Sequence, residues 1–159
     1  MPSNKKNIRN LNLTDLKDFF ISKNKKAFRG KQVYEWLWKK SVRSFSEMTN
    51  LDKETQVILN DNFCINHLEI SEQQQSKDKT IKFAFKLIDN KTVEGVLIPT
   101  KSRMTACISS QVGCSLSCKF CATGQLNRLR NLDAGEIYDQ VFLINQVANE
   151  IYKICFKTI

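Results

Sequence analysis

The first third of the chain has the hydrophobic spacing of short amphipathic helices. Apolar residues recur every three or four positions over residues 13–22 and over residues 30–43. A further helical pattern begins near Asp52, within residues 44–66. The residues expected to form the cores of these helices are Leu13, Leu16, Phe19, Phe20, Val33, Trp36, Leu37, Val57, Ile58, Leu59 and Phe63.

The middle of the chain changes from helical spacing to alternation. The polar run at residues 71–79 predicts a turn or hinge. Residues 80–87 alternate between apolar and polar side chains, and a short turn leads into residues 92–98, so the two segments predict a β-hairpin. Residues 104–109 predict a third strand, which enters a cysteine-rich loop. After that loop, a capping-box pattern opens an amphipathic helix over residues 133–153.

This order of elements predicts an α/β fold in three parts. Residues 1–70 form a small helical accessory domain, residues 71–100 a connecting β-hairpin, and residues 101–159 the first βα unit of a parallel, TIM-type partial barrel. One strand and one helix cannot close a parallel sheet. We therefore expect the apolar face of helix 133–153 to lack a partner and this part to be poorly ordered.

The positive charge is concentrated at one end of the chain. The net charge is +9, and residues 1–43 hold 12 Lys or Arg against three Asp or Glu, so they carry all of the excess. Such a patch attracts polyanions, which makes a nucleic acid the natural partner, although an ordinary lysine-rich surface has the same composition. The candidates for phosphate contacts are Lys25, Lys26, Arg29 and Lys31, and the candidates for base stacking, if they are not core residues, are Phe28, Trp36 and Trp38.

Three of the six cysteines stand close together, in the run QVGCSLSCKFCATG. No export signal or membrane span precedes them, so they predict a metal site in a reducing cytoplasm rather than a disulfide framework. Thiolates at Cys114, Cys118 and Cys121 can hold three corners of a soft metal centre and leave one position open. The alternative is a zinc site completed by a fourth cysteine, for which the candidates are Cys64, Cys107 and Cys155.

The spacing C-x3-C-x-aromatic-C resembles that of the radical S-adenosylmethionine (SAM) enzymes. The flanking segments FRGKQVYEWLW, SFSEMTNL, VEGVLIP and LDAGEIYDQV are similar, in the same order, to the RlmN type of RNA methyltransferase. The related Cfr-type enzymes, which methylate C8 instead of C2 of the same adenosine, are near neighbours. The resemblance runs from about Phe28 to about Tyr152.

The resemblance implies a specific reaction. RlmN-type enzymes methylate C2 of an adenosine in the peptidyl-transferase centre of large-subunit ribosomal RNA and in some tRNAs. One SAM methylates a cysteine near the C-terminus, and a second SAM, cleaved at a [4Fe-4S] cluster, gives a radical that activates this methyl group. A covalent protein–RNA bridge forms, a base removes the C2 proton, and a second cysteine releases the product through a transient disulfide.

The resemblance also implies roles for six residues. Cys114, Cys118 and Cys121 would bind the cluster, and Phe120 would lie near SAM. Glu94 would be the proton acceptor and Cys107 the resolving cysteine. Because side chains alternate along a strand, Glu94 shares one strand face with Val96 and Ile98. Burial on this apolar face would make the carboxylate a suitable base, unless the face reaches solvent. Cys107 alternates away from its neighbours toward a cavity, or is a small core residue.

The remaining cysteines and the single histidine match no role in this family. Cys64 and Cys155 are expected to pack in cores, and His67 to lie at the surface or in a loop.

The resemblance stops where a full barrel would continue. A barrel of this kind needs further βα units, and the closing ICFKTI departs from the family pattern. We expect a truncated chain that is not catalytically competent alone. For the whole enzyme, the expected partners are large-subunit rRNA, tRNA and an electron donor such as flavodoxin or ferredoxin. The whole enzyme is expected to be a monomer and not to associate with a membrane. The alternative is a non-catalytic RNA-binding or metal-binding fragment.

Overall fold

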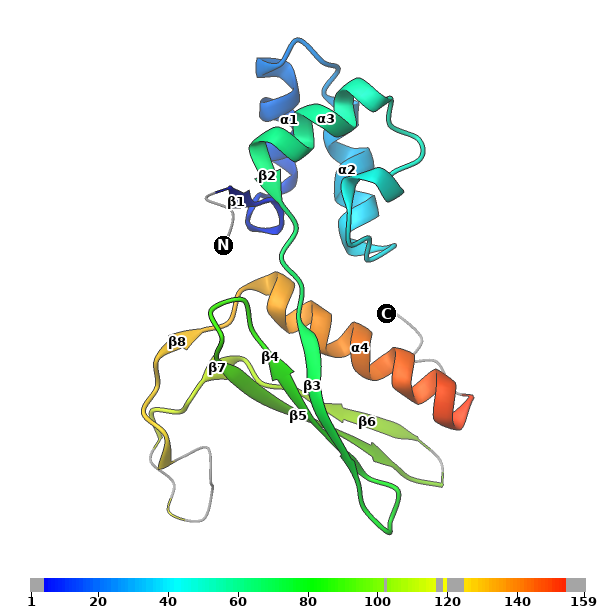
Figure 1. The fold of residues 1–159 in the computed structure, drawn as a ribbon, viewed down its shortest axis with the longest axis vertical. Coiled ribbons are helices and arrows are strands. Elements are labelled where there is room, and N and C mark those ends of the chain that lie inside the picture. The colour runs from blue at the N-terminus through cyan, green and yellow to red at the C-terminus, as the bar shows by residue number, and fades with distance from the viewer. Residues whose placement is uncertain (1–4, 102, 117–118, 120–124, 154–159) are drawn as a thin grey trace. The chain divides into compact units, whose positions relative to one another are not determined.

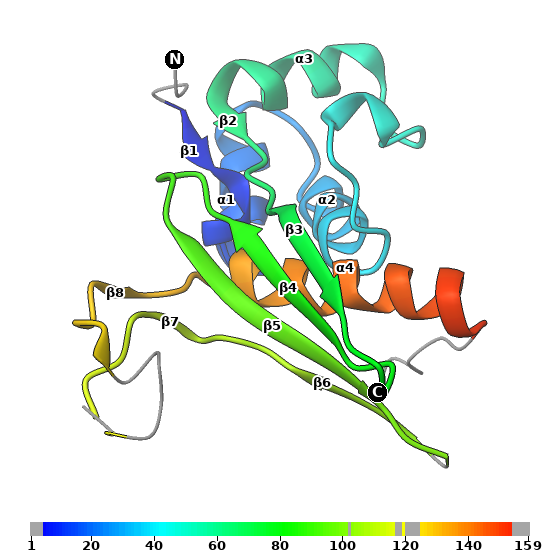
Figure 2. The ribbon, with the colours of Figure 1, turned by 60° about the horizontal axis from the view of Figure 1, so that its bottom comes forward.

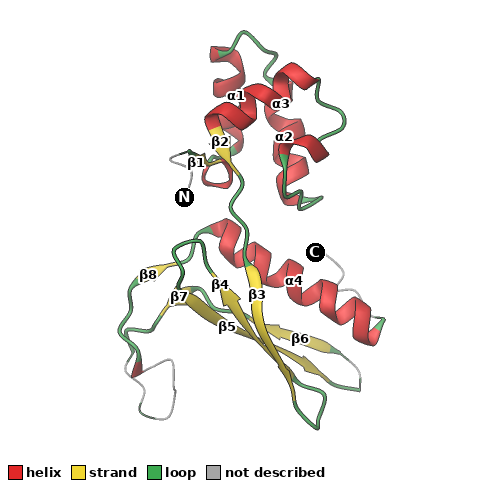
Figure 3. Cartoon of the chain, in the orientation of Figure 1, coloured by secondary structure: helices red, strands yellow, loops and turns green. Residues whose placement is uncertain are grey.

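Residues 5–101, 103–116, 119 and 125–153 are described by a computed structural model. The chain divides between Asn66 and His67 into two units, each with its own hydrophobic core (Figure 1). The first unit is mainly helical and the second combines a sheet with one long helix, so the mixed α/β class predicted from the sequence is confirmed (Figure 3).

The first unit packs three α-helices around buried aliphatic and aromatic side chains. Its elements are β1 (Lys6–Asn7), η1 (Ile8–Asn10), α1 (Leu13–Ser22), α2 (Phe28–Trp38), η2 (Phe45–Glu47), α3 (Lys53–Asn62) and β2 (Phe63–Cys64). The short strands β1 and β2 pair in parallel. Helix α1 has the predicted bounds because a reciprocal capping box of Asn12 and Asp15 satisfies its first backbone groups.

Two expectations for this unit are corrected. Helix α2 ends at Trp38 rather than at residue 43, because Ser41 has a φ of 52°, which a right-handed helix does not allow. Helix α3 begins after Asp52 as predicted, since the Asp52 carboxylate accepts the Thr55 N–H at 3.1 Å. Leu59 of this helix is buried, but Val57 is 58% exposed and is not a core residue.

The second unit is built on an antiparallel sheet with strand order β3-β4-β5-β6. The strands are β3 (Glu69–Gln75), β4 (Ile81–Lys86), β5 (Thr92–Pro99) and β6 (Met104–Cys107). Two further strands, β7 (Gln111–Val112) and β8 (Arg130–Asn131), pair with each other, and α4 (Ala134–Tyr152) follows. Figure 2 shows α4 lying across one face of the four-stranded sheet.

The predicted hairpin is therefore the centre of a larger sheet. Residues 71–79 were expected to form a turn or hinge, yet most of them extend β3, which pairs with β4 from Glu69 to Gln75. Only Ser76–Lys79 turns, closed by the Ser76 N–H donating to Thr80 O at 2.9 Å. The polar run did not predict this strand, because a strand at the edge of a sheet can expose almost every side chain.

Helix α4 has a hydrophobic partner, so the expectation that its apolar face would lack one was wrong. Leu143, Ile144 and Ala148 are buried against the sheet. The side chains that cover them alternate along β4 and β5, and include Phe83 and Phe85. Within the described residues the sheet is antiparallel, so the parallel barrel remains a prediction. None of the helices in this part of the chain is both long and apolar enough to cross a membrane.

Candidate functional site

The sheet has one face covered by α4 and one open face. Alternate residues of β5 are buried toward α4, so Glu94 and Val96 point to the open face. Cys107 of β6 lies directly opposite Val96 in the antiparallel ladder and therefore points the same way. Glu94 and Cys107 are thus diagonal neighbours on one face, a relation that typically spans about 7–8 Å.

The sequence left two alternatives for Glu94, burial on an apolar face or a face that reaches solvent. The second is found, since the Glu94 side chain is 52% exposed and Ile98 on the same face is 39% exposed. The apolar side chains of this strand instead lie on the opposite face, against α4. The Glu94 carboxylate is therefore accessible from the open face rather than enclosed by the protein core.

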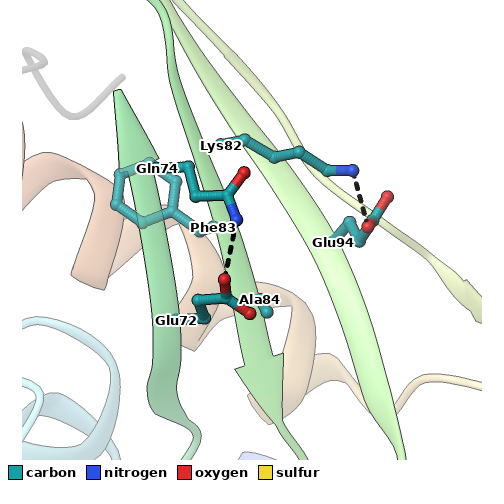
Figure 4. A pocket seen from close by; sticks show the side chains of 6 residues that line it. All are labelled: Glu72, Gln74, Lys82, Phe83, Ala84 and Glu94. Atoms are coloured by element: carbon teal, nitrogen blue, oxygen red, sulfur yellow. Dashed lines mark hydrogen bonds and ion pairs between the residues drawn. The ribbon is translucent and has the colours of Figure 1, made fainter. Parts of the chain in front are cut away.

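A lysine on the neighbouring strand contacts Glu94. Lys82 Nζ lies 2.7 Å from Glu94 Oε1, and beside this pair Gln74 Nε2 donates to Glu72 Oε1 at 2.7 Å (Figure 4). An ion pair this exposed contributes about 0–1 kcal/mol to stability, so its main effect is to orient the carboxylate. The sequence gives no sign of this contact, because only the register of β4 against β5 brings Lys82 and Glu94 together.

A groove of about 360 Å³ joins Glu94 to the start of the cysteine loop. Ser109, Gly113 and Leu126 line it together with Glu94. The Ser109 hydroxyl donates to the backbone carbonyl of Glu94 at 2.8 Å, which ties the segment after β6 to β5. This groove is the place where a small substrate group would contact both the carboxylate and the cysteine loop.

The base of the cysteine loop is closed by backbone pairing. Strands β7 and β8 pair antiparallel, and the Cys114 N–H donates to Leu126 O at 3.1 Å. Gly113 has a φ of 74°, and a Cβ atom there would lie 2.1 Å from Asn127 O. Only glycine fits this position, because it has neither the Cβ atom nor the steric bar to positive φ.

Of the predicted cluster ligands, only Cys114 belongs to the described residues. Its side chain is half-buried, and its Sγ accepts the Leu116 N–H at 3.4 Å. Cys118, Cys121 and Phe120 lie outside the described residues, as does Cys155. No group of three metal-ligating side chains occurs within the described part, which holds one member of the predicted triplet. The thiolate donors of this loop fit a soft metal centre.

Arg130 holds the end of the cysteine loop in place. Its guanidinium contacts both carboxylate oxygens of Glu136, at 2.7 and 2.8 Å, and Asp89 Oδ2 at 3.0 Å. The hydrogen bonds to Glu136 and then to Asp89 raise the pKa of Arg130. The hydrogen bond from Arg130 is the largest cause that lowers the pKa of Asp89, to about 2. The loop exit is thereby linked to the β4–β5 turn and to the start of α4.

Replacing Arg130 with methionine is expected to raise the pKa of Asp89 toward its ordinary value of 3.8. A carboxylate with a lowered pKa stabilises the folded state above its unfolded pKa, and this contribution is lost as the pH falls through about 2. NMR titration of the Asp89 side chain measures the change, with Arg128→Met as the control. An unchanged Asp89 pKa in Arg130→Met would show that Arg130 does not set it.

Two of the four candidate phosphate-binding side chains are already paired within the first unit. Lys25 Nζ lies 2.7 Å from Glu54 and joins the α1–α2 loop to α3, whereas Arg29 contacts Asp52 at 3.1 Å and joins α2 to the residue that caps α3. Lys26 and Lys31 are exposed. These two lysines are the stronger candidates for contact with a polyanion, because neither forms an ion pair with another of the described residues.

Other side chains singled out by sequence have structural surroundings. Phe28 is 50% exposed, whereas Trp36 and Trp38 are partly buried against the core of the first unit. His67, expected at the surface or in a loop, lies in the loop between β2 and β3, where its side chain is 16% exposed and 3.8 Å from Asp139. Cys64 is half-buried rather than a core residue. The described cysteines, Cys64, Cys107 and Cys114, are free thiols.

Comparison with known proteins identifies close relatives. Residues 6–65 match the family described as the ribosomal RNA large subunit methyltransferase N-terminal domain. The chain is 63% identical over 149 residues to a probable dual-specificity RNA methyltransferase RlmN of Cytophaga hutchinsonii, covering 94% of the chain and 41% of that protein. A protein of the same description from Flavobacterium johnsoniae is 56% identical, with coverage of 92% and 42%.

A solved structure has the same fold. The crystal structure of a radical SAM methyltransferase from Sphaerobacter thermophilus superposes with a TM-score of 0.77 at 30% sequence identity, covering 95% of this chain and 44% of that one. The chain spans about two-fifths of the length of the curated relatives it matches.

Proposed function

Because this chain corresponds to the N-terminal part of RlmN-family RNA methyltransferases, we propose that it supplies the RNA-docking unit and half of the active site of a radical SAM enzyme. The reaction would be methylation of C2 of adenosine in large-subunit rRNA and in some tRNAs, through a methylcysteine intermediate. The observation that carries this proposal is the open face of the sheet, where Glu94 and Cys107 are neighbours and where one groove joins Glu94 to the cysteine loop.

Cys114, Cys118 and Cys121 would hold a [4Fe-4S] cluster, with Phe120 beside SAM. When bound, this pair of cofactors supplies an electron and an organic radical, with the electron delivered by a donor such as flavodoxin or ferredoxin. Glu94 would accept the proton that leaves the adenine ring, since its carboxylate is accessible and held by Lys82. Cys107, an exposed free thiol on the same face, would resolve the covalent protein–RNA bridge.

The first unit would dock the RNA. Its excess positive charge attracts phosphates, and Lys26 and Lys31 expose their ammonium groups beside and on α2. Phe28 is 50% exposed at the start of the same helix and offers a flat apolar surface to an unstacked base. The docking unit and the site unit have separate cores, so each role can be tested independently of the other.

Anaerobic reconstitution with iron and sulfide tests the metal centre. We expect a brown, sulfide-containing centre with about four irons per chain, and its complete loss in the Cys114→Ala, Cys118→Ala, Cys121→Ala triple variant, because no thiolate then remains on the loop. Metal and sulfide analysis and a visible spectrum measure it, and Cys64→Ala is the matched control. Stoichiometric zinc without sulfide would contradict the proposal and favour a zinc-stabilised RNA-binding fragment.

A further inference from the structure

A glutamine of α4 is fully buried and bonds to the backbone where β6 meets the cysteine loop. Gln140 has no exposed surface. Its Oε1 accepts the Ser109 N–H at 2.9 Å, and its Nε2 donates to Ser109 O at 2.9 Å. The same Nε2 also contacts Glu136 O at 3.2 Å, within α4. A side-chain amide that bonds both backbone groups of one residue replaces a neighbouring strand at that point.

Ser109 is the point where three parts of the candidate site meet. It follows Cys107 of β6 by two residues. Its hydroxyl donates to Glu94 O at 2.8 Å, which connects it to β5. The next residue, Ser110, accepts the Leu132 N–H at 2.9 Å, and this bond joins the two sides of the cysteine loop base. Fixing Ser109 therefore fixes the strand of Glu94, the strand of Cys107 and the entrance to the loop relative to one another.

We propose that Gln140 is a positioning residue that sets the entrance of the cysteine loop against Glu94. The inference rests on the function proposed above for Glu94 and the loop cysteines. Gln140 touches neither the open face nor the groove directly, so it acts through Ser109. Its amide is specific for this task, because an apolar side chain of the same size would fill the space but leave the Ser109 N–H and C=O without these partners.

Local positioning and general stabilisation by Gln140 predict different effects when its side chain is replaced. A residue that only stabilises the unit would, when removed, accelerate opening of the whole sheet. A positioning residue would loosen the segment around Ser109 and leave the central strands protected. The two cases differ in which backbone amides exchange their hydrogens faster, whatever the cluster does.

Hydrogen–deuterium exchange of the whole chain makes this distinction. We expect Gln140→Met to increase exchange about tenfold over residues 107–114, as the loss of two buried hydrogen bonds predicts, with β4 and β5 unchanged. Gln146→Met is the matched control, since Gln146 is exposed on the same helix. If Gln140→Met does not fold, Gln140→Asn, which keeps the amide but shortens its reach, should show the same local pattern. Uniform acceleration across the unit, or no change at residues 107–114, would overturn the proposal.

A second readout follows the reconstituted centre. We expect iron loss to a chelator to be about tenfold faster in Gln140→Met than in the parent chain, with Gln146→Met unchanged, because the loop entrance is less well held. Equal rates of iron loss in the three proteins would overturn positioning of the loop. If the parent chain forms no iron–sulfide centre, the proposed function fails, while hydrogen exchange still decides the role of Gln140.

Discussion

Gly113→Ala is expected to abolish formation of the iron–sulfide centre while leaving the first unit folded. The added Cβ atom would lie 2.1 Å from Asn127 O and 2.8 Å from Asn127 C, which are backbone atoms of the opposite side of the loop base. This clash is relieved only if the Asn127 side of the loop base moves away from Gly113. The bonds from Cys114 N–H to Leu126 O and from Leu129 N–H to Val112 O would then break. The φ of 74° adds a steric cost of about 1 kcal/mol for any L-residue with a side chain.

The clash and the unfavourable φ together are expected to destabilise the folded loop base by about 3 kcal/mol or more. Iron and sulfide per chain after reconstitution measure the expected loss, with Ser115→Ala as the control, because Ser115 is exposed in the same loop. Gly113→Asn separates the two causes, since asparagine tolerates positive φ but carries the same Cβ atom. A full complement of iron and sulfide in Gly113→Ala would show that the loop base does not need this geometry.

Local patterns predicted those elements that bury one face and expose the other. Helix α1 has the predicted bounds, and the alternation of residues 80–87 corresponds to β4, whose apolar residues are buried. Strand β3 could not be predicted in this way, because its side chains are almost all polar and its backbone pairing with β4 decides its structure. The end of α2 depends on the backbone of Ser41, which leaves no signal in the hydrophobic pattern.

For the candidate site too, some features could be predicted from the sequence and others could not. The spacing of the cysteines is visible in the sequence, and the family resemblance singles out Glu94 and Cys107 as candidates. Their placement on one open face follows from the β5–β6 register, which sequence periodicity does not specify. Lys82 was missed because only strand pairing brings it to Glu94, and the contact of Arg130 with Asp89 was missed because 41 residues separate the two.

Gly30→Ala is expected to unfold the first unit selectively. Gly30 lies where α2 approaches the backbone of α1, and a Cβ atom there would be 2.8 Å from Lys17 N and 2.9 Å from Leu16 C. Backbone atoms cannot rotate away, so the two helices must separate and expose Leu16 and Val33, which are now fully buried. The expected loss of stability is about 3 kcal/mol, a large part of what a unit of this size has.

Both tryptophans, Trp36 and Trp38, belong to the first unit, so their fluorescence reports its unfolding alone. In urea titrations we expect Gly30→Ala to shift the fluorescence transition strongly and to lower affinity for a large-subunit rRNA fragment, because Lys26 and Lys31 are no longer held in place by the folded unit. Iron and sulfide binding should persist, since the second unit has a separate core. Glu35→Ala, which removes an exposed carboxylate of the same helix, should change stability by less than about 0.5 kcal/mol. Undiminished RNA affinity in an unfolded first unit would assign RNA docking to the second unit instead.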